Sequence, residues 1–269
     1  MMDVLLGLLN LESALLVAII FLPLERLLPA HRGRRLLRRG WVNDTVYFIV
    51  NRIPIGIGLL LVAAAAIAAG EAFVPAGLRA GVAAQPLWVQ LPVLLLLGDL
   101  AFYLVHRLFH TIPFLWRFHA IHHSIDELDW LAAHRVHPVD QILTKGASIL
   151  PCFLLGFSDG AIALYFLLYQ WHSLLLHSNI KVGFGPLHYL VASPCFHHWH
   201  HADHPEAWNR NYSAQLPLWD MLFGTANMRR DALPTRYGIE DRVPATYWSQ
   251  LLHPFRRRAT HDPARIPAE

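Results

Sequence analysis

The stretch His119-Ala-Ile-His122-His123 has two counterparts in this chain, which read His106-Arg-Leu-Phe-His110 and His197-His198-Trp199-His200-His201. Imidazole is the commonest metal ligand of proteins near neutral pH. Side chains three and four positions apart share one helix face, so each cluster can direct its rings into one cavity. The clusters place eight histidines at HxxxH or HxxHH spacing, more than one coordination sphere requires. Adjacent histidines diverge by about 100° on a helix and can serve two ions, so we predict a two-metal site.

The composition places these clusters in a membrane protein. Of the 269 residues, 55% are hydrophobic and 15% are charged, whereas ordinary globular chains contain about 25% charged residues. Basic residues gather between His31 and Arg39, beside apolar stretches and without an aromatic stacking platform. That arrangement favours charge at a membrane surface and argues against nucleic-acid binding. The two cysteines, Cys152 and Cys195, do not make a disulfide framework.

Four apolar stretches approach the roughly 20 residues that a membrane-spanning helix needs. They are Val4–Leu24, Val46–Ala69, Leu87–Leu104 and Ile142–Leu176. The last is broken at Gly156-Phe-Ser-Asp-Gly160 and is long enough for a helical hairpin that enters the bilayer and returns. We therefore predict an all-α fold, an integral membrane helical bundle with a cytoplasmic helical cap that carries the histidine-rich dimetal site.

The arginine-rich loop sets the expected orientation. Cytoplasmic loops carry an excess of Lys and Arg, so the loop from His31 to Arg39 is expected in the cytoplasm, with all three histidine clusters on the same side. We expect a multi-pass protein of a bacterial inner membrane. The predicted division is residues 1–86 as membrane anchor helices, 87–226 as the catalytic domain and 227–269 as a C-terminal cytoplasmic tail.

The ligand types narrow the choice of metal. An all-imidazole set suits Zn, Cu, Fe or Ni, and the sequence has neither HExxH nor a carboxylate at ExxH spacing. Chemistry on a membrane lipid favours redox-active iron. Asp99 lies seven residues before His106, on the same helix face, and we expect it to orient a ligand histidine. Direct ligation by Asp99 and a plain helix-packing contact are the alternatives.

Further motifs surround the clusters in a fixed order. They read Asp99-x-x-x-Tyr103-x-x-His106, Trp116-x-x-His119-x-x-His122-His123-Ser124, His134-Arg-x-His137-Pro138, His177-Ser-Asn179, Ser193-Pro194-x-x-His197 and Trp219-Asp220-x-x-Phe223-Gly224-Thr225. In order and spacing, these six blocks, from Leu97 to Thr225, resemble the fatty acid hydroxylase/sterol desaturase superfamily of membrane di-iron oxygenases.

The resemblance implies a set of iron ligands. These would be His106, His110, His119, His122, His123, His137, His177, His197, His200 and His201. Asp99, Tyr103, Asp220 and His134 would lie next to the ligands. Whether His134 and His172 bind metal stays open, and His198 is left out. We expect His188, His204, His253 and His261 to be exposed to solvent.

The implied reaction is O₂-dependent hydroxylation or desaturation of a lipid, such as a sterol or fatty acyl chain, at two iron ions. The sequence has no dinucleotide, flavin, haem or iron–sulfur motif, so an external electron donor is expected, a reductase with a ferredoxin or cytochrome b5-like carrier. Three alternatives remain: ether-lipid or aldehyde processing on the same scaffold, a zinc hydrolase, and a non-redox metal-binding or transport protein.

Overall fold

The computed structural model describes residues 11–230 and 232–256. The regular elements of this part of the chain are all helices, apart from isolated bridges such as Pro29 to Ile180. The prediction of an all-α fold is therefore confirmed. The α-helices are α2 Leu11–Leu27, α3 Trp41–Val50, α4 Arg52–Phe73, α5 Ala76–Ala83, α6 Leu87–Thr111, α7 Pro113–His123, α8 Pro138–Leu154, α9 Asp159–His177, α10 Pro194–His200, α11 Leu218–Leu222 and α12 Tyr247–Leu252. Short 3₁₀ helices are η1 Ala132–His134, η2 Gly185–Tyr189, η3 Pro205–Ala207 and η4 His253–Phe255.

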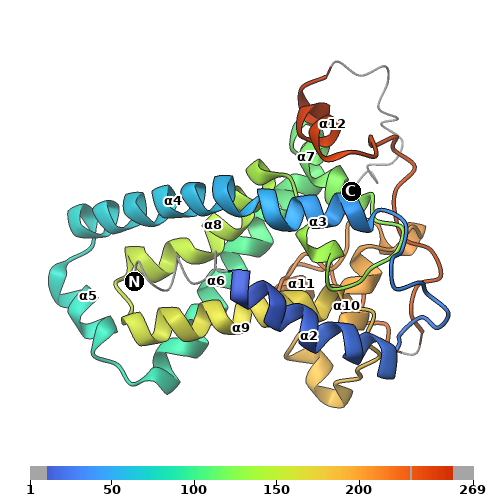
Figure 1. The fold of residues 1–269 in the computed structure, drawn as a ribbon. Coiled ribbons are helices and arrows are strands. Elements are labelled where there is room, and N and C mark those ends of the chain that lie inside the picture. The colour runs from blue at the N-terminus through green and yellow to red at the C-terminus, as the bar shows by residue number, and fades with distance from the viewer. Residues whose placement is uncertain (1–10, 231, 257–269) are drawn as a thin grey trace.

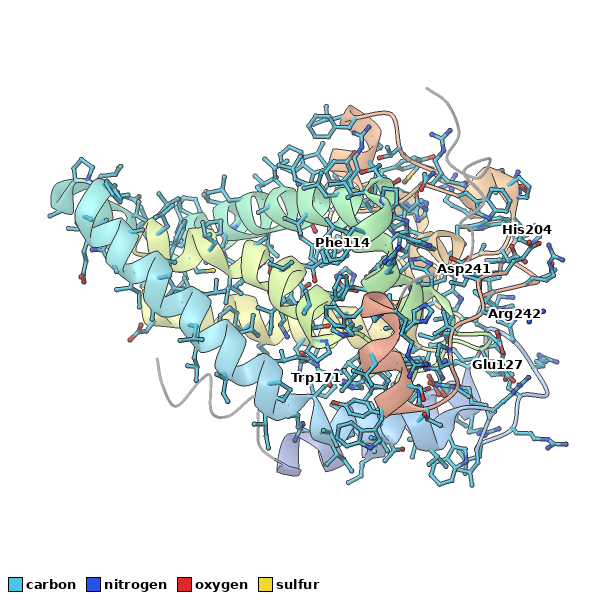
Figure 2. The ribbon with its side chains drawn as sticks, turned by 90° about the horizontal axis from the view of Figure 1, so that it is seen from above. Phe114, Glu127, Trp171, His204, Asp241 and Arg242 are labelled. Atoms are coloured by element: carbon cyan, nitrogen blue, oxygen red, sulfur yellow. The ribbon has the colours of Figure 1, made fainter. Side chains whose placement is uncertain are left out.

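The long helices α4, α6, α8 and α9 run side by side, with α5 at one end and the histidine-bearing segments at the other (Figure 1). Figure 2 places Glu127, His204 and Arg242 at the histidine-bearing end as well. In the described residues, α4 and α6 have the length and composition of membrane spans, with mean hydropathies of 2.3 and 1.8. The fourth stretch is broken where predicted, between α8 and α9, and these two helices pack against α6.

The helix boundaries differ from the predicted stretches in two places. The predicted span from Val46 is divided at Asn51 into α3 and α4. Pro54 has no N–H to donate to the Val50 carbonyl, and the buried Asn51 side chain binds other segments: its Nδ2 donates to the Val136 carbonyl and its Oδ1 accepts from the Tyr247 hydroxyl. The third stretch continues as helix to Thr111 and so carries the first histidine cluster. Of the predicted first span, residues 4–10 lie outside the described residues, and α2 covers the remainder.

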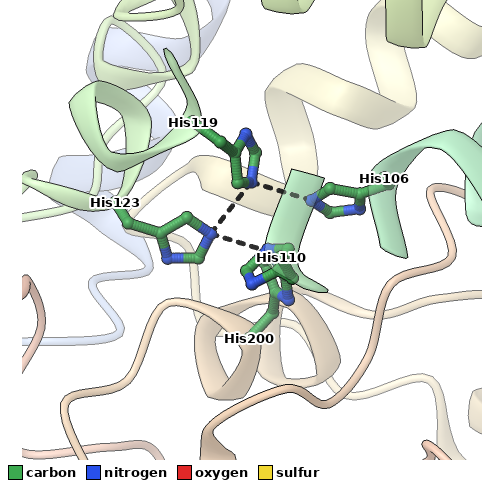
Figure 3. A group of neighbouring side chains, drawn as sticks. All are labelled: His106, His110, His119, His123 and His200. Carbon is green, nitrogen blue, oxygen red and sulfur yellow. Dashed lines mark hydrogen bonds between the residues drawn. The ribbon is translucent and has the colours of Figure 1, made fainter. Parts of the chain in front are cut away.

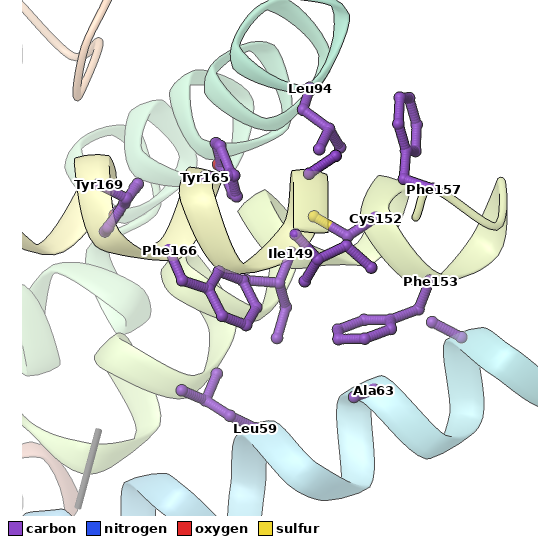
Figure 4. Packing of buried hydrophobic residues seen from close by; sticks show 13 residues of the cluster. Leu59, Ala63, Leu94, Ile149, Cys152, Phe153, Phe157, Tyr165, Phe166 and Tyr169 are labelled. Carbon is purple, nitrogen blue, oxygen red and sulfur yellow. The ribbon is translucent and has the colours of Figure 1, made fainter. Parts of the chain in front are cut away.

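The core of the bundle joins α4, α6, α8 and α9 through apolar side chains such as Leu59, Leu94, Ile149 and Phe166 (Figure 4). A Cβ atom on Gly98 would collide with the Tyr165 hydroxyl. Small residues allow helix backbones to approach closely where no hydrophobic effect separates protein from lipid. This close packing holds α6 against α9 and thereby fixes the histidines at the ends of both helices.

A buried ion-pair network joins the arginine-rich loop to α3 and to the segment between α7 and α8. Arg38 binds Asp44 through Nη2 at 2.6 Å and Asp129 through Nε at 2.6 Å. Arg135 also binds Asp44: its Nε donates to Oδ1, and its Nη2 donates at 3.0 Å to Oδ2, the oxygen that Arg38 contacts. Buried pairs persist when good geometry and hydrogen bonds offset desolvation. Arg38 is therefore a structural link, and not a membrane-surface charge as the loop's composition indicated.

Candidate metal centre

Four helices bring the predicted histidines to one end of the bundle. His106 and His110 lie near the C-terminal end of α6, and the second cluster lies in the last turns of α7. His177 is the last residue of α9. The third cluster lies in and just after α10, which begins where the Ser193 hydroxyl caps the Phe196 N–H. Each cluster keeps the helical spacing that its sequence predicts.

The rings form two groups, and in each the potential ligand atoms all lie within 4.8 Å of one another. The first group contains His106, His110, His119, His123 and His200. The second contains His122, His177, His197 and His201. The adjacent pairs, His122 with His123 and His200 with His201, are divided between the groups, which is the geometry expected for two ions. Figure 3 shows the first group, with rings from α6, α7 and α10 turned toward one another.

Hydrogen bonds to Nδ1 settle the tautomer of three rings in the first group. Nδ1 of His106 donates to the Tyr212 carbonyl at 2.7 Å, and Nδ1 of His200 donates to the Arg210 carbonyl at 2.8 Å. Nδ1 of His119 lies 2.7 Å from a carboxylate oxygen of Asp140. Carbonyl and carboxylate oxygens only accept, so each Nδ1 must carry the proton. A neutral ring then presents Nε2 as a bare lone pair.

The second group has the same arrangement at two rings. Nδ1 of His122 donates to the Arg135 carbonyl at 3.1 Å, and Nδ1 of His177 donates to the Ser173 carbonyl at 2.8 Å. Metal-bound histidines usually donate their other N–H to a carbonyl or carboxylate in this way. Five rings, His106, His119, His122, His177 and His200, are therefore oriented with Nε2 available as a ligand.

The available lone pairs face one another. Nε2 of His106 lies 2.9 Å from Nε2 of His119, and Nε2 of His177 lies 3.1 Å from Nε2 of His122. No proton lies between the two Nε2 atoms of such a pair, because each neutral ring carries its proton on Nδ1. Two unshielded lone pairs at this distance repel, and a cation among them removes the repulsion. The donor set therefore fits a bound metal ion in each group.

Burial also favours binding of a metal ion over protonation of these rings. Desolvation of the charged form lowers the pKa of His200 to about 3, with its bond to the Arg210 carbonyl opposing the shift. Burial also lowers the pKa of His122 and His201 far below the ordinary value. These three rings are therefore neutral at pH 7, which is the form that binds metals. Nε2 of His110 is buried without a hydrogen-bond partner, as expected of an unused ligand atom.

His137 does not join either group, contrary to the prediction. Its Nδ1 accepts from the Val139 N–H and so caps α8, and its Nε2 donates to the Leu251 carbonyl at 3.2 Å. Both ring nitrogens are used, so no lone pair is left for a metal. His172 is likewise outside the groups, with Nε2 bonded to the Ala192 carbonyl. His198, left out of the predicted set, binds the Tyr237 hydroxyl and the Ser178 carbonyl.

The two acidic residues of the prediction, Asp99 and Asp220, bind backbone N–H groups and not the clustered histidines. Asp99 accepts from the backbone N–H groups of Ala214, Gln215 and Leu216, at 2.8–2.9 Å, so the expectation that it orients a histidine is wrong.

Asp220 accepts from the backbone N–H groups of Tyr212 and Ser213, and the Tyr103 hydroxyl reaches Thr225, which donates to Asp220. These contacts hold the segment whose Tyr212 carbonyl orients His106.

The carboxylate that does contact a clustered histidine, Asp140, was missed at the level of sequence. It follows His137-Pro-Val at the start of an apolar stretch, and an acid in that position is the signal that could have identified it.

Two expectations for other histidines also need correction. His134 contacts none of the ring groups directly but packs against Phe48, and His188, expected at the surface, is 2% exposed and bonded to the Ser193 hydroxyl. His261 lies outside the described residues.

Comparison with known proteins identifies the family. A profile of the fatty acid hydroxylase family matches residues 91–225. The chain belongs to the fatty acid hydroxylase family. The matched part of this family member contains both histidine groups and Asp140, whereas α2, α3, α4, α5 and α12 lie outside it.

Among the curated relatives, an ornithine lipid hydroxylase, OlsE, of Rhizobium tropici is 32% identical over 173 residues, which are 64% of this chain and 52% of the relative. An alkylglycerol monooxygenase of Caenorhabditis elegans is 29% identical, over 52% of this chain and 28% of the relative. A very-long-chain aldehyde decarbonylase, GL1-5, of Oryza sativa subsp. indica is 26% identical, over 79% and 35%. This family member thus spans about half the length of the first relative and less of the others. No solved structure matches the chain.

Proposed function

We propose that this chain is a membrane-bound, O₂-dependent di-iron oxidoreductase that hydroxylates a C–H bond of a lipid. One observation carries the proposal: two adjoining groups of buried histidines present ring nitrogens toward one another, with no proton available between the oriented pairs. The family membership supports lipid oxidation, and the names of the relatives include a lipid hydroxylase and a monooxygenase.

The proposed ligands are the nine histidines of the two groups, without His137. Imidazole donors suit iron among other transition metals, and bound iron would supply the one-electron and O₂ chemistry that amino-acid side chains lack. The carbonyls of Tyr212, Arg210 and Arg135 and the carboxylate of Asp140 bind Nδ1 of these rings, which would leave Nε2 free to hold the metal. Burial keeps bulk water from the site.

A small cavity of about 80 Å³ supplies a place for the reacting carbon. It is bordered by rings from both groups, namely His106, His119, His122, His177 and His197. Its remaining wall contains Phe102, Tyr169 and Leu176. A C–H bond held here would lie beside both groups, and fixed placement of reactants is a large part of catalysis.

The overall reaction needs electrons from outside. Hydroxylation breaks one C–H bond and the O–O bond of O₂, forms one C–OH and releases water, and it consumes two electrons and two protons. Because the sequence carries no motif for an electron-transfer cofactor, we propose a separate reductase with a ferredoxin or cytochrome b5-like carrier. We place the histidine-bearing end on the cytoplasmic side of a bacterial inner membrane, because the adjoining loop is rich in arginine.

The test is a product assay with metal analysis on the full chain. We expect about two iron ions per chain, as the two donor groups imply, and incorporation of one oxygen atom from labelled O₂ into a lipid. Removal of iron by a chelator should abolish turnover, and added ferrous iron should restore it. Equal activity without O₂ in a zinc-loaded preparation would support a hydrolase and overturn the proposal.

A further inference from the structure

A larger cavity, of about 370 Å³, adjoins the small one beneath the histidines. Its walls come from α2, α3, α4, η1, α8 and α9, and its volume falls in the range of small-molecule sites. Four residues line both cavities: Ala133, Gln141, Tyr169 and Ser173. Whatever occupies the larger cavity therefore lies next to the space that borders both histidine groups.

One part of this cavity is apolar and reaches the outside of the bundle. Leu59 and Leu60 of α4 and Leu174 of α9 line it. Leu16 of α2 and Leu167 of α9 also line it, and they are 50% and 53% exposed. Apolar side chains that face both a cavity and the outer surface of a membrane protein provide a route for a lipid chain.

Another part of the wall is cationic. Lys145 of α8 and Arg52 of α4 both line the cavity. Lys145 Nζ binds the Gln170 side-chain oxygen at 3.2 Å and lies 5.5 Å from the centre of the Tyr169 ring. Among the described residues, no Asp or Glu forms an ion pair with Lys145. An ionisable group in an apolar helix of a membrane protein is expensive and is retained for a function by default.

An unpartnered polar atom lies beside these cations. Nε2 of His134, which lines the same cavity, is buried and has no hydrogen-bond partner in the described part of the chain. Arg52 and His134 both pack against the Phe48 ring, at 4.9 and 4.4 Å from its centre, and Lys145 lines the same cavity. Buried polar atoms usually have a partner, and an exception calls for an explanation such as a ligand.

We propose that this cavity binds a lipid with an anionic group, a carboxylate or a phosphate, which pairs with Lys145 while the hydrocarbon chain follows the leucines toward the bilayer. The inference rests on the proposed lipid oxidation for its purpose, but it concerns binding. Lys145 lies five residues after Asp140, about 7.5 Å along α8, and Asp140 contacts His119. The carbons nearest the anionic group are therefore the ones placed by the histidines.

Binding is measured on the iron-loaded full chain in phosphatidylcholine nanodiscs. The probes are radiolabelled palmitate, dipalmitoyl phosphatidic acid and hexadecanol, which separate a carboxylate, a phosphate and an uncharged head. We expect saturable binding of palmitate, phosphatidic acid or both, which assigns the anionic source, and weaker binding of hexadecanol. Equal binding of hexadecanol and both anions, or no saturable binding of either anion, would overturn the proposal.

Substitutions of Lys145 test whether its positive charge binds the anionic group. Lys145→Met should weaken binding of the preferred anion about tenfold, the effect of losing one charge-assisted hydrogen bond, while leaving hexadecanol binding within about twofold. Lys145→Arg should retain binding. Lys181→Met is the matched control, because Lys181 is exposed and lies outside this cavity. If Lys145→Met fails to retain iron, Lys145→Gln replaces it with a polar side chain of similar length.

The outcomes separate this inference from the proposed function. Unchanged anion binding in Lys145→Met, with iron and lipid oxidation intact, would overturn the cavity assignment alone. Lysine-dependent binding in a chain that never oxidises lipid would leave the cavity assignment standing without the oxygenase. Where turnover is detected, the hydroxyl should lie within the first few carbons from the anionic group, and hydroxylation at the methyl end would contradict the placement.

Discussion

The Asp140 carboxylate lies 2.7 Å from Nδ1 of His119, and both side chains are buried. This contact assigns the proton of His119 to Nδ1 and directs the lone pair of Nε2 toward His106 and His123. It joins α8 to the histidines of α7. The carboxylate thus fixes the orientation of one ring.

Asp140→Asn should weaken iron retention about 10- to 100-fold, the usual effect of losing a partner that orients a metal ligand. The amide can keep the hydrogen bond but not the charge, so the fold should persist. Iron per chain after dialysis against a graded chelator series measures the effect. Asp159→Asn, at the exposed start of α9, is the matched control, and equal iron retention in both variants would refute the assigned role.

His122→Ala should abolish O₂-dependent lipid oxidation and lower the metal content while leaving membrane insertion intact. The reason is that His122 belongs to the second group and presents Nε2 to His177. Product analysis and metal content are measured in membranes with equal amounts of inserted protein. Full activity of the variant would end the assignment of this site.

His137→Ala is the informative contrast, because both ring nitrogens of His137 are engaged away from the groups. This variant should keep its iron. It should lose about 1 kcal/mol of stability through the missing cap of α8, visible as a lower thermal midpoint. A loss of iron comparable to that of His122→Ala would return His137 to the ligand set.

Asp99→Ala should destabilise the protein more than it alters the metal ligands directly. The change leaves the backbone N–H groups of Ala214, Gln215 and Leu216 without their acceptor. The Gln215 group is buried and the other two are partly buried, and each loss of a buried partner costs about 1–3 kcal/mol. Thermal unfolding in detergent measures it. Leu96→Ala, at a surface position of the same helix, is the control, and a midpoint equal to that of the control would contradict this account.

A reporter fused after Glu269 should be cytoplasmic, because the arginine-rich loop and the histidine-bearing end are expected on the same side. A paired set of fusions, one active only in the cytoplasm and one only outside it, gives the reading. Activity of the external reporter would reverse the proposed orientation while leaving the metal site unaffected.

Much of the fold could be predicted because apolar length and helical spacing are local properties. The break between α8 and α9 follows from a long apolar stretch interrupted at Gly156. The division at Asn51 coincides with Pro54, which removes one helix hydrogen bond. The partners of the Asn51 side chain could not be predicted, because this carbonyl and hydroxyl belong to residues 85 and 196 positions away. Arg38 was misjudged for the same reason, since its partner Asp129 is distant in sequence.

The sequence by itself determined which side chains can bind metal and that adjacent histidines can serve two ions, because ligand chemistry and helical angle belong to each segment alone. The tertiary structure decided which histidines meet. It separates His137, whose nitrogens are both bonded elsewhere, from His177, whose Nε2 faces His122. The tertiary structure also determines which backbone carbonyls bind the rings. Every residue carries a carbonyl, so only the folded path of the chain decides which one reaches a given imidazole.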